Sequence, residues 1–383
     1  METAHSLQQI QSSYIREILQ AACDENIISL AGGLPDKSTF PTQLIRPAME
    51  KLAGEVDIFQ YGNTDGYPPL LSLLRDKYQL ADNHKALVCT GSQQALDLLA
   101  RAFINPGDNI VMEAPSYLGA MQVFGLCQAN ILTVPQLSNG PDLDALETQF
   151  SQSAVKLFYA VPDFHNPTGV CWSLEVRKKV AELCIRYDVT LVEDAPYREL
   201  RFSGDELPMV SEFCPDKSIV LRSFSKIASP GLRLGVATGA ANYIDPMIKV
   251  KQGADLHSSV PMQALLLELI SQPEFDHHLS STQQLYKARY QKLMREIEGK
   301  LGDKCQVNPV QGGMFVWLTL PQSDTMSLAK NSLEKGVAVV PSKVFYPEGS
   351  PQSSALRLNF TNASDHELEL AVERLSEVIG SVS

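Results

Sequence analysis

The chain has 383 residues, of which 44% are hydrophobic and 20% are charged, as expected of a globular protein with a large core. Its formal net charge of −12 disfavours nucleic acid and anionic membranes as partners, because an acidic surface attracts neither. No run approaches the roughly 18 apolar residues of a membrane helix, and the polar start lacks the features of a signal peptide.

The seven cysteines are scattered along the chain and form no Cys-x-x-Cys pair. Free thiols of this kind are typical of a reducing compartment, so a cytoplasmic protein is expected. The histidines show no metal-ligand spacing, so no metal site is expected. We interpret His277-His278 as a solvated pair on a helix.

Taken in chain order, the first 45 residues are rich in loop signals such as Gly32-Gly33-Leu34-Pro35 and are expected to pack against the C-terminal part. The next part alternates short β-branched runs with amphipathic helical stretches. This alternation is typical of an α/β protein with a mostly parallel sheet sandwiched by helices. Strands are predicted at 86–90, 109–113, 157–162, 190–193, 219–222 and 234–238, with helices at 92–103, 117–129 and 174–187.

The pattern changes after Ser259. A long helical region is predicted at 261–301, followed by short strands at 314–320 and 338–340 and a helix near 366–379. We interpret this part as a second, smaller α/β unit. The predicted division is 1–45 for the N-terminal segment, 46–280 for the large domain and 281–383 for the small domain.

The most informative segment runs from Ser223 to Gly235 and reads Ser-Phe-Ser-Lys-Ile-Ala-Ser-Pro-Gly-Leu-Arg-Leu-Gly. A lysine amine that is kept neutral can form a Schiff base with an aldehyde. A guanidinium offers a fork of donors for a phosphate. Lys226, beside Ser223, Ser225 and Arg233, therefore combines aldehyde capture with phosphate capture, which describes pyridoxal 5′-phosphate as the ligand.

Asp194 follows the predicted strand at 190–193, so its carboxylate emerges from an apolar strand. A carboxylate there can hold a proton on a pyridine nitrogen and make the ring an electron sink. Taken alone, a strand-terminal aspartate also fits a helix N-cap. Tyr197 can place a phenol at the ring hydroxyl, although a lone tyrosine is more often packed in a core.

Two turns follow predicted strands at the edge where open α/β sheets bind ligands. Asn166-Pro167-Thr168-Gly169 is a turn whose amide could contact the phenolate oxygen of the cofactor. Thr90-Gly91-Ser92-Gln93 lies between a strand and a helix, where backbone N–H groups and the helix dipole make an anion site. Helix capping by Ser92 is compatible with that role.

Tyr117, at a predicted helix start, can stack on a flat heterocycle, although a lone aromatic is more often part of the core. Arg357 is flanked by apolar residues, so its charge needs a fixed partner. A bidentate carboxylate fits, and so does a structural salt bridge.

Together and in this order, these motifs resemble the fold-type-I pyridoxal-phosphate enzymes of the class I/II aminotransferases. The chain is most similar to the branch with 2-aminoadipate aminotransferases and the catalytic domain of GntR-type regulators. The resemblance covers nearly the whole length and includes Gln60-Tyr61-Gly62, Asn166-Pro167-Thr168-Gly169, Val192-Glu193-Asp194, the lysine segment, Gln311-Gly312-Gly313 and Leu356-Arg357-Leu358.

The resemblance implies residue roles. Lys226 is the expected Schiff-base lysine, Asp194 the partner of the pyridine nitrogen and Tyr117 the stacking ring, and these three are the expected catalytic residues. The expected cofactor-binding residues are Ser92, Gln93, Tyr117, Asn166, Asp194, Tyr197, Ser223, Ser225, Lys226, Arg233 and, from a second subunit, Tyr61. For the substrate, Arg357 is expected to bind the α-carboxylate, with Gly33, Asn166, Ser13 and Arg16 as further contacts.

Two residues depart from the family pattern. His165 stands where glutamine is common, and Ser342 stands where Val-Pro is usually followed by glycine. His165 is next to the cofactor asparagine, so it could alter the surroundings of Asn166.

The resemblance implies a homodimer that moves an amino group between an L-amino acid and a 2-oxo acid, with 2-oxoglutarate as the expected acceptor. A β-lyase or a decarboxylase on the same scaffold is the first alternative. A regulator using this domain as a sensor is the second, but it needs a basic winged-helix module, and the chain begins with the Ser13–Leu19 segment of the domain itself. A nicotinamide dehydrogenase is disfavoured because no Gly-x-Gly-x-x-Gly follows a strand.

Overall fold

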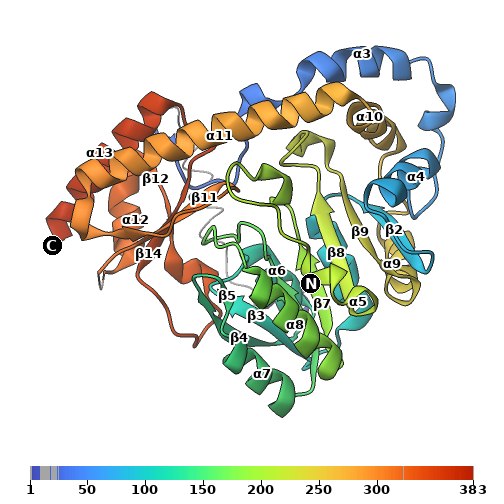
Figure 1. The fold of residues 1–383 in the computed structure, drawn as a ribbon, viewed down its shortest axis with the longest axis horizontal. Coiled ribbons are helices and arrows are strands. Elements are labelled where there is room, and N and C mark those ends of the chain that lie inside the picture. The colour runs from blue at the N-terminus through green and yellow to red at the C-terminus, as the bar shows by residue number, and fades with distance from the viewer. Residues whose placement is uncertain (1, 9–17, 19–23, 25, 322, 383) are drawn as a thin grey trace.

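The computed structural model describes all residues except 1, 9–17, 19–23, 25, 322 and 383 (Figure 1). An eight-stranded sheet forms the centre of the larger part of the molecule. β9 runs antiparallel to both of its neighbours and β5 runs antiparallel to β4, while the other pairs are parallel. The spatial order is β2 (His84–Cys89), β9 (Gly235–Ala240), β8 (Ser218–Ser223), β7 (Thr190–Asp194), β6 (Val155–Ala160), β3 (Asn109–Ala114), β4 (Asn130–Leu137) and β5 (Gly140–Pro141).

Helices cover both faces of this sheet because the central strands are apolar on both sides. In β6, Leu157 and Tyr159 face one core cluster and Phe158 and Ala160 face the other. Residues of α5 (Ser92–Phe103), α6 (Leu118–Leu126) and α9 (Ala241–Ala254) belong to the first cluster, and residues of α7 (Leu143–Gln152) and α8 (Leu174–Arg186) to the second. The predicted α/β architecture with a mostly parallel sheet is confirmed.

The smaller part is built on a four-stranded antiparallel sheet. Its order is β10 (Gln306–Val307), β11 (Phe315–Thr319), β14 (Ala355–Asn359) and β13 (Val340–Pro341). The helices α12 (Thr325–Glu334) and α13 (Asp365–Val382) belong to this part. β1 (Ile28–Ser29) pairs in parallel with β12 (Val337–Ala338), which supports the predicted packing of the N-terminal segment on the small domain. The domain boundaries themselves stay predictions.

The helical region predicted at 261–301 is confirmed, and it consists of two helices. α10 (Val260–Ile270) ends before Pro273, which starts α11 (Pro273–Lys300), because proline fits the first turn of a helix better than its interior. α11 crosses from the large part to the small part in Figure 1, and there it packs against α13. In the described part of the chain, the remaining α-helices are α1 (His5–Gln8), α3 (Thr42–Leu52) and α4 (Pro68–Lys77), the last two beside α10.

The interpretation of His277 and His278 as a solvated pair needs a correction. His277 is exposed, but His278 is half-buried and its Nε2 lies 3.1 Å from the Ile227 carbonyl oxygen. The helix period explains the difference, because neighbouring residues on α11 point in different directions and only one of them meets the large domain.

Candidate active site

A pocket lies where β6, β7 and β8 end and α5 begins, which is the edge predicted from the motifs. Most of the predicted cofactor-binding residues meet here, although the chain brings them from five separate segments. The pocket is lined by Gly91, Ser92, Gln93, Tyr117, Tyr159, Val161, Asn166, Asp194, Pro196, Tyr197, Ser223, Ser225, Lys226, Pro230 and Arg233.

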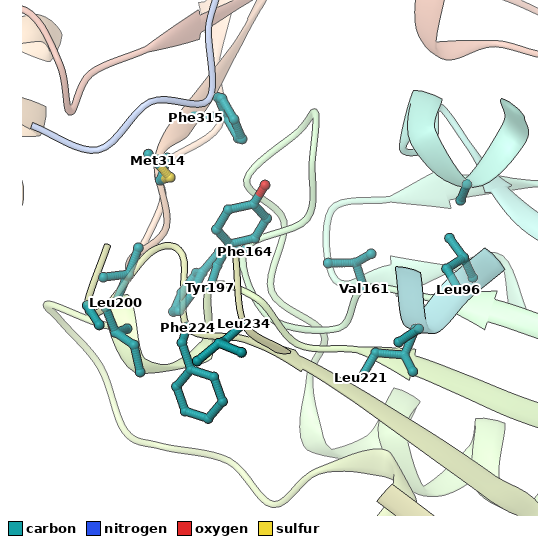
Figure 2. Packing of buried hydrophobic residues seen from close by; sticks show 14 of the residues in the cluster. Leu96, Val161, Phe164, Tyr197, Leu200, Leu221, Phe224, Leu234, Met314 and Phe315 are labelled. Carbon is teal, nitrogen blue, oxygen red and sulfur yellow. The ribbon is translucent and has the colours of Figure 1, made fainter. Parts of the chain in front are cut away.

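Lys226 lies in the loop that follows β8. Phe224 anchors this loop, since its ring is buried in the core and its backbone N–H donates to the Leu234 carbonyl at 3.1 Å (Figure 2). Lys226 Nζ donates to the Gly33 carbonyl at 2.7 Å. Burial and the positive charges of Arg357 and Arg233 lower the pKa of Lys226 to about 8. The amine is therefore far more often neutral near pH 7 than an ordinary lysine, as a nucleophile or general base requires.

Asp194 is the last residue of β7 and is only 4% exposed. Its Oδ2 accepts a hydrogen bond of 2.7 Å from the Tyr159 hydroxyl, whereas its buried Oδ1 has no partner among the described residues. Burial raises the pKa of Asp194 to about 7, although the Tyr159 hydrogen bond acts in the opposite direction. A buried carboxylate oxygen left without a donor matches a cationic N–H group of a ligand.

The sequence reasoning missed Tyr159. It stands in β6 in a run of apolar residues, and its neighbour across the sheet is Val192 of β7. The available signal was its place in the strand alternation, since Tyr159 lies near the carboxyl end of a strand beside the one that ends in Asp194. A tyrosine in such a buried strand is still interpreted as a core residue, and its ring does pack against Phe124.

The start of α5 forms a corner of the pocket that is rich in hydrogen-bond donors. Gly91 precedes the helix with φ +79°, and no side chain caps the helix here in the described structure. A Cβ at Gly91 would lie 3.1 Å from Arg233 Nη2, so glycine lets the guanidinium come close to the helix start. Arg233 Nη2 also donates to the Thr90 carbonyl at 3.4 Å. Ser223 and Ser225 complete a set of donors that suits a phosphate.

Tyr117, Tyr197 and Asn166 form the opposite wall. The Tyr117 hydroxyl donates to Gln93 Oε1 at 3.0 Å, which ties the tyrosine to the first turn of α5. Asn166 Nδ2 donates to the Tyr197 hydroxyl at 3.4 Å. Burial raises the pKa of Tyr117 to about 12, and burial also raises the pKa of Tyr197, so both phenols stay protonated and can donate.

Arg357 enters from β14 of the small domain and is 4% exposed. Its Nη1 donates to Asn166 Oδ1 at 2.8 Å, and its Nη2 donates to the Ala31 carbonyl. The guanidinium carbon lies 4.3 Å from the centre of the Phe315 ring, and Phe315 meets Tyr197 edge to face (Figure 2). Burial lowers the pKa of Arg357 to about 10, and its Nε has no partner among the described residues. No carboxylate of the described chain pairs with it, so the charge fits an anionic ligand.

An ion cluster behind the pocket holds the loop that carries Asn166. Asp163 is buried and pairs with Arg177 at 2.6 Å and with Arg198 at 2.8 Å. Burial raises the pKa of Asp163, but the hydrogen bonds and charges of these arginines outweigh it, so the net pKa lies below its ordinary value. The carboxylate is therefore a fixed anchor for the residues just before Asn166.

The remaining predicted site residues are Gly33, Tyr61, Ser13 and Arg16, of which the structure describes the first two. Gly33 contacts Lys226 through its carbonyl, as described above. Tyr61 is 80% exposed, packs edge to face on His257 and is not among the described residues that line the pocket. Ser13 and Arg16 lie outside the described residues, so their predicted substrate contacts stay predictions. Of the departures, His165 is buried, and Ser342 Oγ donates to the Ser353 carbonyl at 2.6 Å.

The comparisons with known proteins agree on one family. Residues 25–375 match the family model "Aminotransferase class I and II". The chain is 35% identical to aromatic-amino-acid aminotransferase 1 of Thermococcus litoralis, over 97% of this chain and 92% of that protein. It is also 35% identical to the 2-aminoadipate transaminase of Thermus thermophilus, over 97% and 94% of the two chains. The chain belongs to the class I/II aminotransferases.

A solved structure shows the same fold and the same cofactor chemistry. The Pyrococcus horikoshii kynurenine aminotransferase, solved in complex with PMP, superposes with a TM-score of 0.94 at 33% identity, over 99% of this chain and 97% of that chain. The aminotransferase depends on pyridoxal phosphate, as the sequence motifs predicted. The pocket fits this cofactor, because the unpaired Asp194 Oδ1 suits a pyridinium N–H and the start of α5 suits a phosphate.

No group of three or more histidine, cysteine, aspartate or glutamate side chains in the described part of the chain is arranged to hold a metal ion. Within the same residues, no helix is long and apolar enough to cross a membrane.

Proposed function

We propose that this aminotransferase moves the amino group of an L-amino acid to 2-oxoglutarate, with Lys226 as the proton-transferring residue and Asp194 as the partner of the pyridine nitrogen. The observation that carries the proposal is one pocket holding a lysine of lowered pKa and a buried carboxylate with an unpaired oxygen. When bound, pyridoxal phosphate supplies the electron sink that stabilises negative charge at the substrate α-carbon.

The described residues divide the remaining work. Asp194 would hold a proton on the ring nitrogen, while Ser92, Ser223, Ser225 and Arg233 would bind the phosphate. Asn166 and Tyr197 would donate to the ring oxygen. Lys226 Nζ would take the α-proton of the amino acid and return it later, acting first as general base and then as general acid.

Substrate orientation is assigned to Arg357. Its two terminal nitrogens suit the two oxygens of an α-carboxylate, the group that all amino acid and 2-oxo acid substrates share. Its present contacts with the side-chain oxygen of Asn166 and the Ala31 carbonyl hold the guanidinium in place from both sides. The group is thus oriented before substrate binds, which reduces the ordering that binding requires.

We also propose a homodimer with shared active sites. Val56, Phe59 and Tyr61 are 79%, 65% and 80% exposed and lie close together in sequence beside α10, which is unusual for large apolar side chains. A second copy that covers this surface would bring Tyr61 to the partner's phosphate site. Light scattering of wild type and Phe59→Asp tests this. A fully active monomer would remove Tyr61 from the site.

The test of the reaction is a panel of amino acid donors with 2-oxoglutarate, with glutamate formation and the other product both measured. A 2-oxo acid with an unchanged carbon skeleton supports transamination. Pyruvate with ammonia would indicate a β-lyase, and an amine with carbon dioxide would indicate a decarboxylase.

We expect a cytoplasmic enzyme, a prediction that rests on cysteine usage, and the six described cysteines are free.

Arg16 is proposed to contact the substrate side chain, on the basis of the sequence resemblance. Arg16→Ala should therefore weaken acidic donors such as glutamate and 2-aminoadipate, while leucine and aromatic donors stay near wild type. Values of kcat/KM for one acidic and one apolar donor decide the matter. Equal loss for both donors, or no loss for either, contradicts this role.

A further inference from the structure

A chain of buried polar side chains leads from β3 and β4 to the residue that precedes Asn166. Glu113 is the fifth residue of β3, Gln136 belongs to β4, and His165, Thr168 and Trp172 belong to the loop after β6. Glu113 and His165 are each 1% exposed, and Trp172 is fully buried. The aminotransferase chemistry described above uses none of these five side chains directly.

Their hydrogen bonds can be assigned from one fixed donor. The indole Nε1 of Trp172 can only donate, so Glu113 Oε1, 3.2 Å away, must accept. Gln136 Nε2 donates to the same oxygen at 2.9 Å. The other end of the Gln136 amide is then its carbonyl oxygen, which accepts from the Thr168 hydroxyl at 2.5 Å.

The direction of the hydrogen bond between His165 and Thr168 follows from the bond between Thr168 and Gln136. Because the Thr168 hydroxyl has given its proton to Gln136, Thr168 Oγ1 must accept from His165 Nδ1, 3.1 Å away. A neutral imidazole with its proton on Nδ1 has a lone pair on Nε2. That Nε2 faces Glu113 Oε2 at 3.9 Å, and Oε2 has no hydrogen-bond partner among the described residues. Two buried lone pairs would repel each other unless one of the two atoms carries a proton.

We propose that Glu113 and His165 together carry a single proton, and that this pair is the positioning element for Asn166. The separation exceeds a hydrogen bond, so the proton acts by removing the repulsion between two acceptors and keeping the pair neutral. The positioning role rests on the proposed contact of Asn166 with the cofactor, whereas the shared proton does not.

The turn transmits the position of His165 to Asn166. The His165 backbone N–H donates to the Val170 carbonyl at 2.9 Å, and the Gly169 N–H donates to the His165 carbonyl at 2.6 Å, which closes the loop around Asn166. Asn166 in turn contacts Tyr197 and Arg357. A displacement of the imidazole would therefore move the amide that links the two halves of the pocket.

The surroundings of the pair are neutral, so burial governs its protonation. Gln136, Thr168 and Trp172 carry no charge, and the nearest acid in the sequence, Asp163, is paired with Arg177. Burial raises the pKa of Glu113 to about 8, with the hydrogen bonds from Gln136 and Trp172 acting against it. Burial also lowers the pKa of His165 to about 3. Near neutral pH the proton therefore resides on Glu113.

The first experiment uses the cofactor-free protein and compares wild type with Glu113→Gln. Glutamine keeps an oxygen for Trp172 and Gln136 and offers a permanent N–H to His165. In wild type, the Glu113 carboxyl contributes to the free energy of unfolding. This contribution is fully present below pH 4.5 and is lost as the pH rises to about 8, because only the unfolded state releases the proton in that interval. Glu113→Gln has no carboxyl group at this position, so its stability lacks this decrease with rising pH.

The measured quantity is the unfolding equilibrium constant between pH 5 and 9. The ratio between wild type and Glu113→Gln should change by about tenfold per pH unit up to pH 8, which corresponds to one proton. Glu298→Gln, an exposed site on α11, is the control and should run parallel to wild type. If the unfolding constant of Glu113→Gln had the same pH dependence as that of wild type, the proposed proton of the pair would be overturned.

The second experiment tests the positioning of Asn166. Glu113→Gln should bind pyridoxal phosphate as tightly as wild type, whereas Glu113→Leu leaves Trp172 and Gln136 without an acceptor and should bind at least about tenfold more weakly. Tight binding by a folded Glu113→Leu variant would overturn the positioning role. If Glu113→Leu does not fold, His165→Phe serves in its place with the same expectation. The pH experiment needs no cofactor, so its outcome is independent of the proposed reaction.

Discussion

The large domain supplies Asp194 and Lys226 from the ends of neighbouring strands, whereas the small domain supplies Arg357 from the middle of β14. The large-domain groups lie in a buried frame, with Tyr159 on Asp194 and Phe224 under the lysine loop. Arg357 instead makes its contacts across the domain boundary, to Asn166 and to the N-terminal segment. One half of the site is therefore fixed by the sheet, and the other half depends on how two domains meet. The four predictions below test this difference.

The largest effect is expected for Lys226→Ala. Loss of the amine removes the general base and acid, so transamination should fall by at least about 10⁴-fold, while the fold is retained. Single-turnover absorbance of the loaded protein measures this. Borohydride reduction with peptide mapping is the control, and a cofactor found on another lysine would falsify the assignment.

Asp194→Ala should slow proton transfer by about 100-fold or more, because the ring nitrogen loses its partner. Asp194→Asn is the matched variant, since it keeps the shape but removes the charge, and it should be nearly as slow. The rate of the half-reaction with one amino acid is the readout. Near-normal turnover in either variant would reduce Asp194 to a structural residue.

Arg357→Ala should weaken every substrate by about 2–5 kcal/mol, because all of them lose the same carboxylate partner. Acidic, aromatic and aliphatic donors should lose similar factors in kcat/KM. Arg357→Lys should recover part of the loss, since it keeps the charge but not the fork. A loss confined to one class of donor would assign Arg357 to the side chain instead.

The smallest effect is expected for Tyr159→Phe, which removes a hydrogen bond worth about 1 kcal/mol. In the cofactor-free protein, Asp194 contributes to the free energy of unfolding. This contribution is fully present below the ordinary aspartate pKa of 3.8 and is lost as the pH rises to about 7. Because the Tyr159 hydroxyl lowers the pKa of Asp194, its removal should extend this loss to higher pH. Unfolding measured at pH 6 and pH 8 reports the change, and identical pH dependence in both proteins speaks against the coupling.

The same difference explains what the sequence could predict. Strand ends followed by polar residues pointed to Asp194, Asn166 and Lys226, because parallel strands of one sheet end at one edge. Tyr159 was not predicted, since a tyrosine inside an apolar strand gives the same pattern whether or not its hydroxyl has a partner. The contact between Lys226 and Gly33 joins segments that no periodicity relates. The Glu113–His165 pair could not be predicted without the register of β3 and the path of the loop after β6.

The long helix α11 has a mechanical consequence. Its 28 residues span about 42 Å. Near one end, His278 contacts the carbonyl of Ile227, the residue after Lys226. Near the other end, Lys300 Nζ donates to the Glu369 carbonyl of α13 at 3.0 Å. A rigid rod held at both places works as a lever, so a small swing of the C-terminal domain must either shift the peptide beside Lys226 or break the histidine contact.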